Sequence, residues 1–436
     1  MNHRHPLRRR LLLALALGGL VLAAGLALAA RQREVPACTS QEDPVSILVA
    51  TDLHYLSPRL TDGGASFQQV AAQGDGLATA YLSQVTEAFV AQVLAIQPDL
   101  LILSGDLTFN GAAASHADLG EQLASLQAAG IQVLVLPGNH DLNNPNAARF
   151  VGAQAQRQPS RTPQGFRQTY WDFGFRQALS RDWDSLSYCY APRADLRILL
   201  VDTNSQEEGH PSPQSLRWVR RQLEEARDAG AQVIAVSHQT LLDHNSLLSD
   251  GYRMADGAAL LSLYQEFGVL CNLSGHLHLQ HMARDGVTDI VTSALPLSPN
   301  QYGALSYDGT TLQYETRSLD VSPWAAAQGS QDGNLLHFAA YAHTLLLDRA
   351  RQQVLDVLAD SGLPADQQVL LAETFAAINA AYFAGDPIDQ TEFSQGLALW
   401  EGQAPSFYTA CLQSILEDGG SGGYHTAQLT RKTGAP

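Results

Sequence analysis

The sequence has almost no lysine and little charge. Lys432 is the only lysine among 436 residues, so nearly every positive charge is carried by arginine. Charged residues make up 16% of the chain, and the formal net charge is −17. An acidic body of this kind disfavours broad binding to nucleic acid or to an anionic membrane surface. We therefore expect no nucleic-acid partner.

Cysteine is also scarce, and no two cysteines have the CxxC spacing of a zinc knuckle. Four cysteines allow three complete disulfide pairings, among which the sequence does not choose. Cys271 lies in an apolar stretch and fits a buried free thiol equally well. The four positions are Cys38, Cys189, Cys271 and Cys411.

One long uncharged apolar run is present, at Leu11–Ala30, directly after three arginines. A basic segment followed by an apolar run that ends in small residues is typical of an export signal. About twenty apolar residues also suffice to span a bilayer, so an uncleaved anchor is the alternative. In both cases the arginines stay in the cytoplasm. We expect the body to be secreted or anchored at the outer face of the cytoplasmic membrane.

After a linker at residues 31–43, short apolar strands alternate with amphipathic helices. Near-continuous apolar strands separated by helices indicate sheets that are covered on both faces, which predicts an α/β layered body. Residues 288–318 change to short strands with turns, as in an antiparallel ending. The expected strands of this body lie at Pro44–Asp52, Asp99–Asp106, Ile131–Asp141, Leu196–Asn204, Ala231–Gln239 and Gly268–His278.

The pattern changes beyond the α/β body, which we place at residues 44–322. Residues 323–420 contain two long helical segments and a shorter third one, so we predict an α-helical C-terminal appendage. The expected helices within the body include Tyr81–Gln97, Ser115–Gly130 and Ser212–Gly230, with Ser115 and Ser212 near their starts as N-caps. Residues 421–436 are rich in glycine and predict a flexible tail.

Five of the expected strands end in ligand-type side chains. In open α/β sheets, sites form outside the carboxyl ends of the strands, so these five clusters should converge. Each cluster alone is also compatible with an ordinary polar turn. The clusters are Asp52-x-His54, Gly105-Asp106, Gly138-Asn139-His140-Asp141, Ser237-His238 and Gly275-His276-x-His278.

The donors are too many for one catalytic metal, which takes three or four protein ligands. Two metals that share a carboxylate fit better, and Asp106, in the middle of the series, is the candidate bridge. Imidazole together with carboxylate suits zinc, iron or manganese better than calcium, which prefers oxygen alone. We therefore expect two transition-metal ions (Mn, Fe or Zn) as cofactors.

The order DxH, GD, GNHD, H and GHxH resembles the calcineurin-like metallophosphoesterase superfamily over roughly Pro44 to Arg317. The resemblance implies a four-layer β-sandwich flanked by helices. It also implies that His140 faces the substrate and that Asp141 orients His140. One metal would be held by Asp52, His54, Asp106 and His278, and the other by Asp106, Asn139, His238 and His276.

Differences from two other branches of this superfamily indicate which branch the sequence resembles most. Protein phosphatases have an arginine where this chain has Pro137 and a glutamate where it has Asp141. Purple acid phosphatases have a tyrosine at the position of Phe109 and a glycine at that of His54. The motifs are more similar to those of the cyclic-nucleotide phosphodiesterase branch.

The resemblance implies hydrolysis of a small phosphate ester by a hydroxide that bridges two metals. His140 would stabilise charge or protonate the leaving oxygen. We favour phosphodiesters over phosphomonoesters as substrates. A phosphomonoesterase on the same site, or a surface binding module that keeps the fold without turnover, are the alternatives. Residues 11–30 provide a route to a membrane, and the C-terminal helices either pack on the body or bind a partner.

Overall fold

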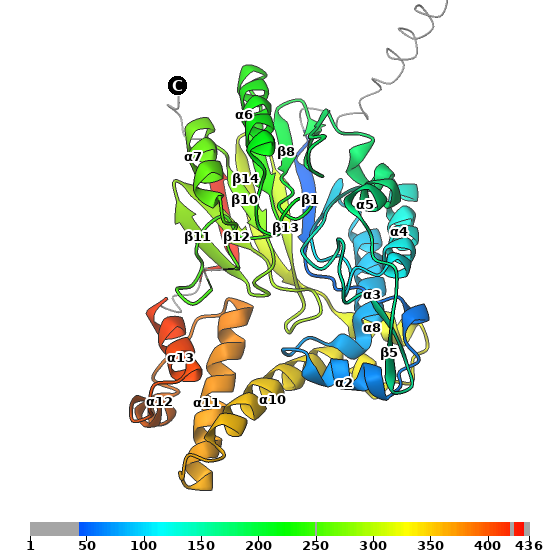
Figure 1. The fold of residues 1–436 in the computed structure, drawn as a ribbon. Coiled ribbons are helices and arrows are strands. Elements are labelled where there is room, and N and C mark those ends of the chain that lie inside the picture. Colours follow the sequence, from blue (N-terminus) through cyan, green and yellow to red (C-terminus); the bar gives the residue numbers. More distant parts are fainter. Residues whose placement is uncertain (1–42, 249–250, 419–422, 431–436) are drawn as a thin grey trace, which may run out of the picture. The chain divides into compact units, whose positions relative to one another are not determined.

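The computed structural model describes residues 43–248, 251–418 and 423–430 (Figure 1). The chain divides into a unit of residues 1–38 and a second unit from Thr39 to Pro436, and all described residues belong to the second. The predicted export signal or anchor at residues 1–30 and nearly all of the predicted linker lie outside the described residues. No helix in the described part is both long enough and apolar enough to cross a membrane.

The first sheet has six strands, in the order β15-β14-β13-β1-β2-β3. β1, β2 and β3 are parallel, and the remaining neighbours are antiparallel. The side chains of β2 are buried on both faces, as expected for a strand with helices on one side and a second sheet on the other. The strands are β1 (Val45–Ala50), β2 (Leu100–Ser104), β3 (Gln132–Leu136), β13 (Gln301–Tyr307), β14 (Thr311–Ser318) and β15 (Thr426–Thr430).

The second sheet has seven strands, in the order β11-β12-β10-β9-β8-β7-β6. Its centre, from β12 to β8, is parallel, and its two ends are antiparallel. The strands are β6 (Ser180–Arg181), β7 (Tyr188–Arg193), β8 (Leu196–Leu200), β9 (Gln232–Val236), β10 (Cys271–Ser274), β11 (His281–Asp285) and β12 (Val287–Val291).

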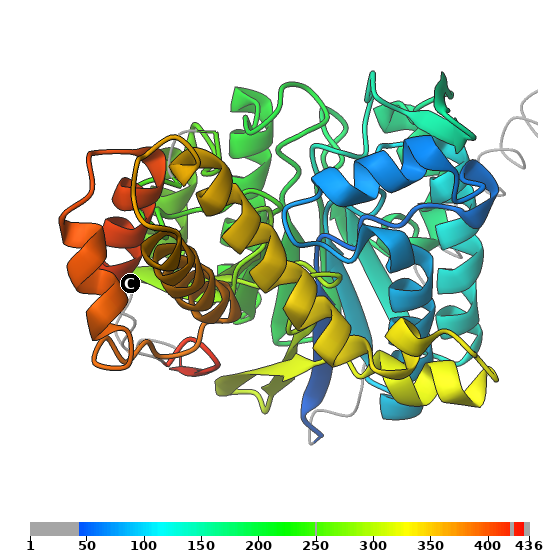
Figure 2. The ribbon, with the colours of Figure 1, turned by 90° about the horizontal axis from the view of Figure 1, so that it is seen from below.

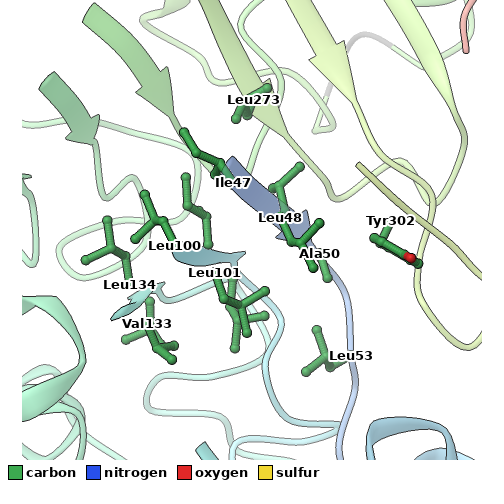
Figure 3. Packing of buried hydrophobic residues seen from close by; sticks show 14 of the residues in the cluster. Ile47, Leu48, Ala50, Leu53, Leu100, Leu101, Val133, Leu134, Leu273 and Tyr302 are labelled. Atoms are coloured by element: carbon green, nitrogen blue, oxygen red, sulfur yellow. The ribbon is translucent and has the colours of Figure 1, made fainter. Parts of the chain in front are cut away.

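The two sheets pack face to face through one apolar core. Ile47 of β1 and Leu273 of β10 belong to this core and are almost fully buried (Figure 3). Helices α3 (Leu82–Ile96) and α4 (Ala113–Ala128) cover the outer side of the first sheet, and α6 (Pro213–Asp228) and α7 (Gly257–Phe267) cover that of the second. The predicted four-layer α/β sandwich is therefore confirmed.

The C-terminal region is helical, as predicted, and packs on the body. Figure 2 shows α10 running from the side of α8 towards α11. Leu277 and Leu279, which follow β10, lie in one apolar cluster with residues of α10, α11 and α13. The helices are α8 (Val321–Ala327), α9 (Gly333–Leu336), α10 (Phe338–Leu358), α11 (Ala365–Ala384), α12 (Ser394–Glu401) and α13 (Phe407–Glu417).

Two local predictions were wrong. Residues Thr426–Thr430 form β15, which pairs with β14, so this part of residues 421–436 is not a flexible tail. Ser115 does not cap α4, because the helix starts at Ala113 and the Ser115 hydroxyl accepts a hydrogen bond from the Ser57 backbone. Four short elements have no clear sequence pattern: α2 (Ala65–Gln73), β4 (Ala148–Val151), β5 (Gln154–Arg157) and α5 (Pro163–Thr169).

Candidate metal centre

The strand ends bring the predicted side chains together. The loops after β1 and β2 are joined by backbone hydrogen bonds from Asp52 to the Gly105 carbonyl (3.0 Å) and from His54 to the Asp106 carbonyl (2.9 Å). Five strands of two sheets thus deliver their ligand-type residues to one place. Three overlapping groups could hold metal ions: Asp52, His54 and His278; His54, Asp106 and His140; and Asp106, His238 and His276.

Five of these residues have an unusual backbone. Among the described residues, eight other than glycine have a positive φ, and five of the eight are predicted metal ligands. Such a conformation is uncommon for side chains with a Cβ and costs of order 1–3 kcal/mol per residue. It turns each side chain inward directly after its strand. The five are Asp52, His54, Asp106, His276 and His278.

Glycines make room for the ligands. A Cβ at Gly138 would lie 2.1 Å from Asp106 Oδ1, and one at Gly275 would lie 2.5 Å from Asp52 Oδ2. A Cβ at Gly105, whose φ is +110°, would overlap the ring of His238. These glycines of the GD, GNHD and GHxH motifs therefore allow the ligand loops to approach closely.

Asp52 directs one oxygen into the first group. Its Oδ2 accepts hydrogen bonds from Thr51 Oγ1 (2.7 Å) and the His276 backbone (3.0 Å). Its Oδ1 is buried without a hydrogen-bond partner and lies 3.3 Å from His278 Nε2. Burial raises and His278 lowers the pKa of Asp52, and the net shift is downward. An ionised, unpartnered oxygen beside two imidazoles fits a cation better than it fits an empty core.

His238 is held in the tautomer that a metal ligand needs. Its Nδ1 lies 3.0 Å from the Ser104 carbonyl, which fixes the proton on Nδ1. Its Nε2 then faces Asn139 Oδ1 (3.1 Å) and Asp106 Oδ2 (3.4 Å). Burial lowers and the charge of Asp106 raises the pKa of His238, to about 9. Metal binding at Nε2 is therefore coupled to loss of a proton.

Asp106 lies between the groups, where the candidate bridge was expected. Its Oδ1 accepts a hydrogen bond from the His140 backbone (2.8 Å). Its Oδ2 is the oxygen nearest to the imidazoles of His238 and His140, at 3.4 and 3.9 Å. A bridging role would therefore fall mainly on Oδ2.

His140 stands at the open side of the site. Its side chain is 43% exposed, whereas that of Asp106 is 2% exposed. Its Nδ1 lies 3.0 Å from the Phe109 carbonyl and hence carries a proton. The charge of Asp106 is the main reason why the pKa of His140 is raised. The ring can therefore present a second proton, at Nε2, to a bound molecule.

Asp141 holds the loops together through hydrogen bonds to their backbones. Its carboxylate accepts hydrogen bonds from the backbones of Leu107, Thr108 and Gly138 and from Thr108 Oγ1. Burial is the main cause that raises the pKa of Asp141 to about 6, and the four donors favour the carboxylate. The expectation was that Asp141 orients His140; the hydrogen bond that orients this ring goes instead to the Phe109 carbonyl, and Asp141 contributes its charge.

His116 is a positioning residue that the sequence did not reveal. Its Nε2 lies 3.1 Å from the Asp141 carbonyl, and its Nδ1 lies 2.9 Å from the Tyr170 hydroxyl. The ring is fully buried and links α4 to the GNHD loop. A histidine in a helix, outside every motif, gives no signal of this role in the sequence.

The remaining imidazoles are suited to metal. Burial lowers the pKa of His54 to about 3 and that of His276 to about 4, so both rings are neutral near pH 7. Neutral imidazole and ionised carboxylate are the forms that bind transition metals. With the unpartnered Asp52 Oδ1 and the space left by the glycines, the donor set fits metal ions.

Comparisons with known proteins agree with this geometry. Residues 45–280 match a family model described as calcineurin-like phosphoesterase. Residues 320–421 match one described as the C-terminal domain of cyclic nucleotide phosphodiesterase. The chain is also 23% identical over 238 residues to a "Probable cyclic nucleotide phosphodiesterase" of Ruthia magnifica subsp. Calyptogena magnifica, an alignment that covers 53% of this chain and 84% of that protein.

Solved structures with low identity are also similar. A dimetal phosphatase from Danio rerio is 14% identical with a TM-score of 0.46, and covers 63% of this chain and 96% of its own. A purple acid phosphatase from yellow lupin is 14% identical with a TM-score of 0.42, and covers 64% of this chain and 52% of its own. Because the first family model spans more than half of the sequence, the chain belongs to the calcineurin-like phosphoesterase family.

Proposed function

We propose that this chain is a phosphodiesterase that hydrolyses cyclic nucleotides at a site for two metal ions. The observation that carries the proposal is the position of Asp106. It belongs to two of the three groups of ligand-type side chains, and His54 connects them to Asp52 and His278. One metal cannot use so many donors, whereas two metals around a common carboxylate can.

The substrate class is supported by two similarities. The C-terminal region matches the C-terminal domain of cyclic nucleotide phosphodiesterase, and the Ruthia relative bears the name of the same activity. A phosphodiester has one negative charge, and the acidic body does not prevent its binding where cations set the local field.

The residues divide between the two ions as the family pattern implies. Asp52, His54, Asp106 and His278 would hold one ion, and Asp106, Asn139, His238 and His276 the other. When bound, such ions neutralise charge on phosphoryl oxygens and lower the pKa of water. The chain itself orients these ligands through the Ser104 carbonyl on His238 and the Thr51 hydroxyl on Asp52.

His140 is the candidate proton donor. Its Nδ1 proton is engaged by Phe109, and the charge of Asp106 favours a further proton on Nε2. The exposed ring edge is where a leaving alkoxide would need that proton. A ribose alkoxide is a poor leaving group, so protonation lowers its barrier more than that of a nitrophenolate.

The test is hydrolysis by the full chain loaded with manganese, zinc or iron. We expect turnover of 3′,5′-cyclic AMP and of bis(4-nitrophenyl) phosphate, with lower kcat/KM for 4-nitrophenyl phosphate. Preference for the monoester, or no turnover of any cyclic nucleotide, would overturn the proposed substrate class.

The metal site has its own test in Asp106→Asn. Loss of a charged common ligand should remove metal and nearly all hydrolysis. Asp118→Asn is a matched control, because Asp118 pairs with the exposed Arg59 outside the site. Elemental analysis that finds two metals per chain in Asp106→Asn would refute the bridging role.

A further inference from the structure

A cavity of about 440 Å³ lies beside the metal centre. On one side it is lined by His276 and His278, and on the other by residues of α10, α11 and α13. Its volume is in the range of small-molecule sites. The C-terminal helices thus form one wall of a space that opens onto the ligands of both proposed ions.

Several exposed apolar side chains line this cavity. Nine large hydrophobic residues are exposed within the described ranges, and three of them line this cavity. Leu247, Tyr252 and Phe407 are 42%, 39% and 70% exposed. Phe383 and Tyr408 are partly buried in the same lining. Apolar surface that gathers around a hollow is typical of a binding site.

Asn379 is a polar residue of the lining whose side chain is not used within the described part of the protein. The amide of Asn379, on α11, makes no hydrogen bond with any residue that the structure describes. The lining has two other amides. Gln353 donates to Asp75 Oδ1 (3.4 Å), and Asn245 donates to the Tyr382 hydroxyl (3.0 Å) and accepts from the Leu247 backbone (2.9 Å). Asn245 is therefore used within the protein, whereas Asn379 keeps both a donor and an acceptor for a bound molecule.

Tyr252 places an aromatic face near the metal centre. Its ring centroid lies 5.8 Å from that of His276, which belongs to the group of Asp106, His238 and His276. If the phosphate of a nucleotide lies at the metals, its sugar can therefore carry the planar base to this ring. Base–aromatic stacking contributes about 1–3 kcal/mol per base.

We propose that this cavity binds the nucleobase of the substrate, with Tyr252 against its face and Asn379 on its edge. The inference rests on the proposed cyclic-nucleotide function and makes the C-terminal helices part of the substrate site. A base has apolar faces and an edge of donors and acceptors, which an unpartnered amide complements. A lipid chain is a poorer fit, because it would cover Asn379 and Arg349 without offering hydrogen bonds.

The experiment compares two diesters on the metal-loaded full chain. The measured quantity is the kcat/KM for cyclic AMP divided by the kcat/KM for methyl 4-nitrophenyl phosphate, a diester without a base. Asn379→Leu and Tyr252→Ala should each lower this ratio at least tenfold. Asn334→Leu and Trp183→Ala are matched controls at exposed positions outside the cavity, and they should leave this ratio unchanged. Tyr252 lies in an exposed position, so its variant tests the site even if Asn379→Leu folds poorly.

Binding of adenosine, measured by ligand-observed NMR, separates the two proposals. Adenosine should bind the parent protein, and it should bind both cavity variants more weakly. If cyclic AMP is hydrolysed but both variants keep the parent ratio, the cavity assignment is overturned. If cyclic AMP is not hydrolysed while adenosine binds and the variants lose it, the proposed function fails and the base site stands. Absence of both hydrolysis and adenosine binding overturns both.

Discussion

His140 is the residue whose task is most clearly separable from metal binding. It is exposed, its Nδ1 is engaged by the Phe109 carbonyl, and its Nε2 is 3.9 Å from Asp106. We expect His140→Ala to keep its metals while the rate on a diester with a poor leaving group falls by roughly 10²–10⁴-fold. The loss should be smaller for a nitrophenyl ester. Rates on both substrates and elemental analysis measure this.

His276→Ala is the comparison for that prediction. Its neutral ring belongs to the group of Asp106, His238 and His276, so metal and activity should be lost together. Metal loss in His140→Ala would instead make His140 a ligand, which its presence in one of the three groups allows. If His140→Ala lowers the rate equally for substrates with good and with poor leaving groups, His140 has only a role in charge stabilisation.

His116 predicts a pH dependence of stability. Burial lowers its pKa to about 3 from an ordinary value of 6.5. As the pH falls through this interval, the unfolded chain takes up a proton that the native state excludes. The free energy of unfolding should therefore decrease, by up to about 1.4 kcal/mol per pH unit from this group.

His116→Gln isolates the contribution. Glutamine can donate to the Asp141 carbonyl and accept from the Tyr170 hydroxyl, but it does not titrate. Urea unfolding between pH 4.5 and 7 should show a shallower pH dependence for this variant than for the parent. Parallel curves would mean that His116 is protonated alike in both states.

At the scale of elements, the loops after β2 and β3 meet at Gly138. Alanine can adopt the φ of Gly138, so Gly138→Ala tests only whether a Cβ fits between the two loops. A Cβ there would lie 2.1 Å from Asp106 Oδ1 and 2.3 Å from the Asp106 nitrogen. We expect Asp106 to shift, with loss of metal and of activity but not of helix content measured by circular dichroism.

Gly120→Ala is the matched control for this change. Gly120 lies within α4, and an added Cβ would meet only Thr169, at an ordinary 3.7 Å. Alanine in place of a glycine in a helix should stabilise the fold by about 0.5–1 kcal/mol and leave metal content unchanged. A fully loaded Gly138→Ala protein would show that the loops tolerate more separation than the structure indicates.

The last strand also has a measurable role. β15 pairs along its length with β14, and the Tyr424 ring lies 3.9 Å from that of His281. Truncation after Glu417 removes both, whereas truncation after Thr430 keeps both. We expect the shorter protein to have a lower Tm and to aggregate more readily, because β14 becomes an unprotected edge. Equal Tm values for the two truncations would contradict this.

The elements differ in how visible they are in the sequence. β1, β2 and β3 are continuous apolar runs that end at ligand motifs, and these could be predicted because both faces are buried. β15 could not, since only Ala427 and the half-buried Leu429 face the core from this short strand. The site residues followed from the motifs, but the tasks of His116 and Asp141 depend on contacts between distant segments.

At the scale of the whole molecule, we propose that the body is exported. The arginines before Leu11–Ala30 and the uncharged run itself motivate the proposal. Full-length protein in a bacterial host should be found outside the cytoplasmic membrane, and protease added to intact cells should reach an anchored form. A variant that lacks residues 1–30 should stay in the cytosol. Full-length protein found only in cytosol would refute export.

The first and last described strands, β1 and β15, lie in the same six-stranded sheet. That sheet cannot be completed until residues 426–430 have been synthesised. Pairings between residues so distant in sequence form slowly, because a long loop must close before they gain any contact. Until the pairing with β15 forms, β14 is an edge strand of the sheet. The last pairing of the first sheet thus becomes possible only after the C-terminal helices α8 to α13 have been made.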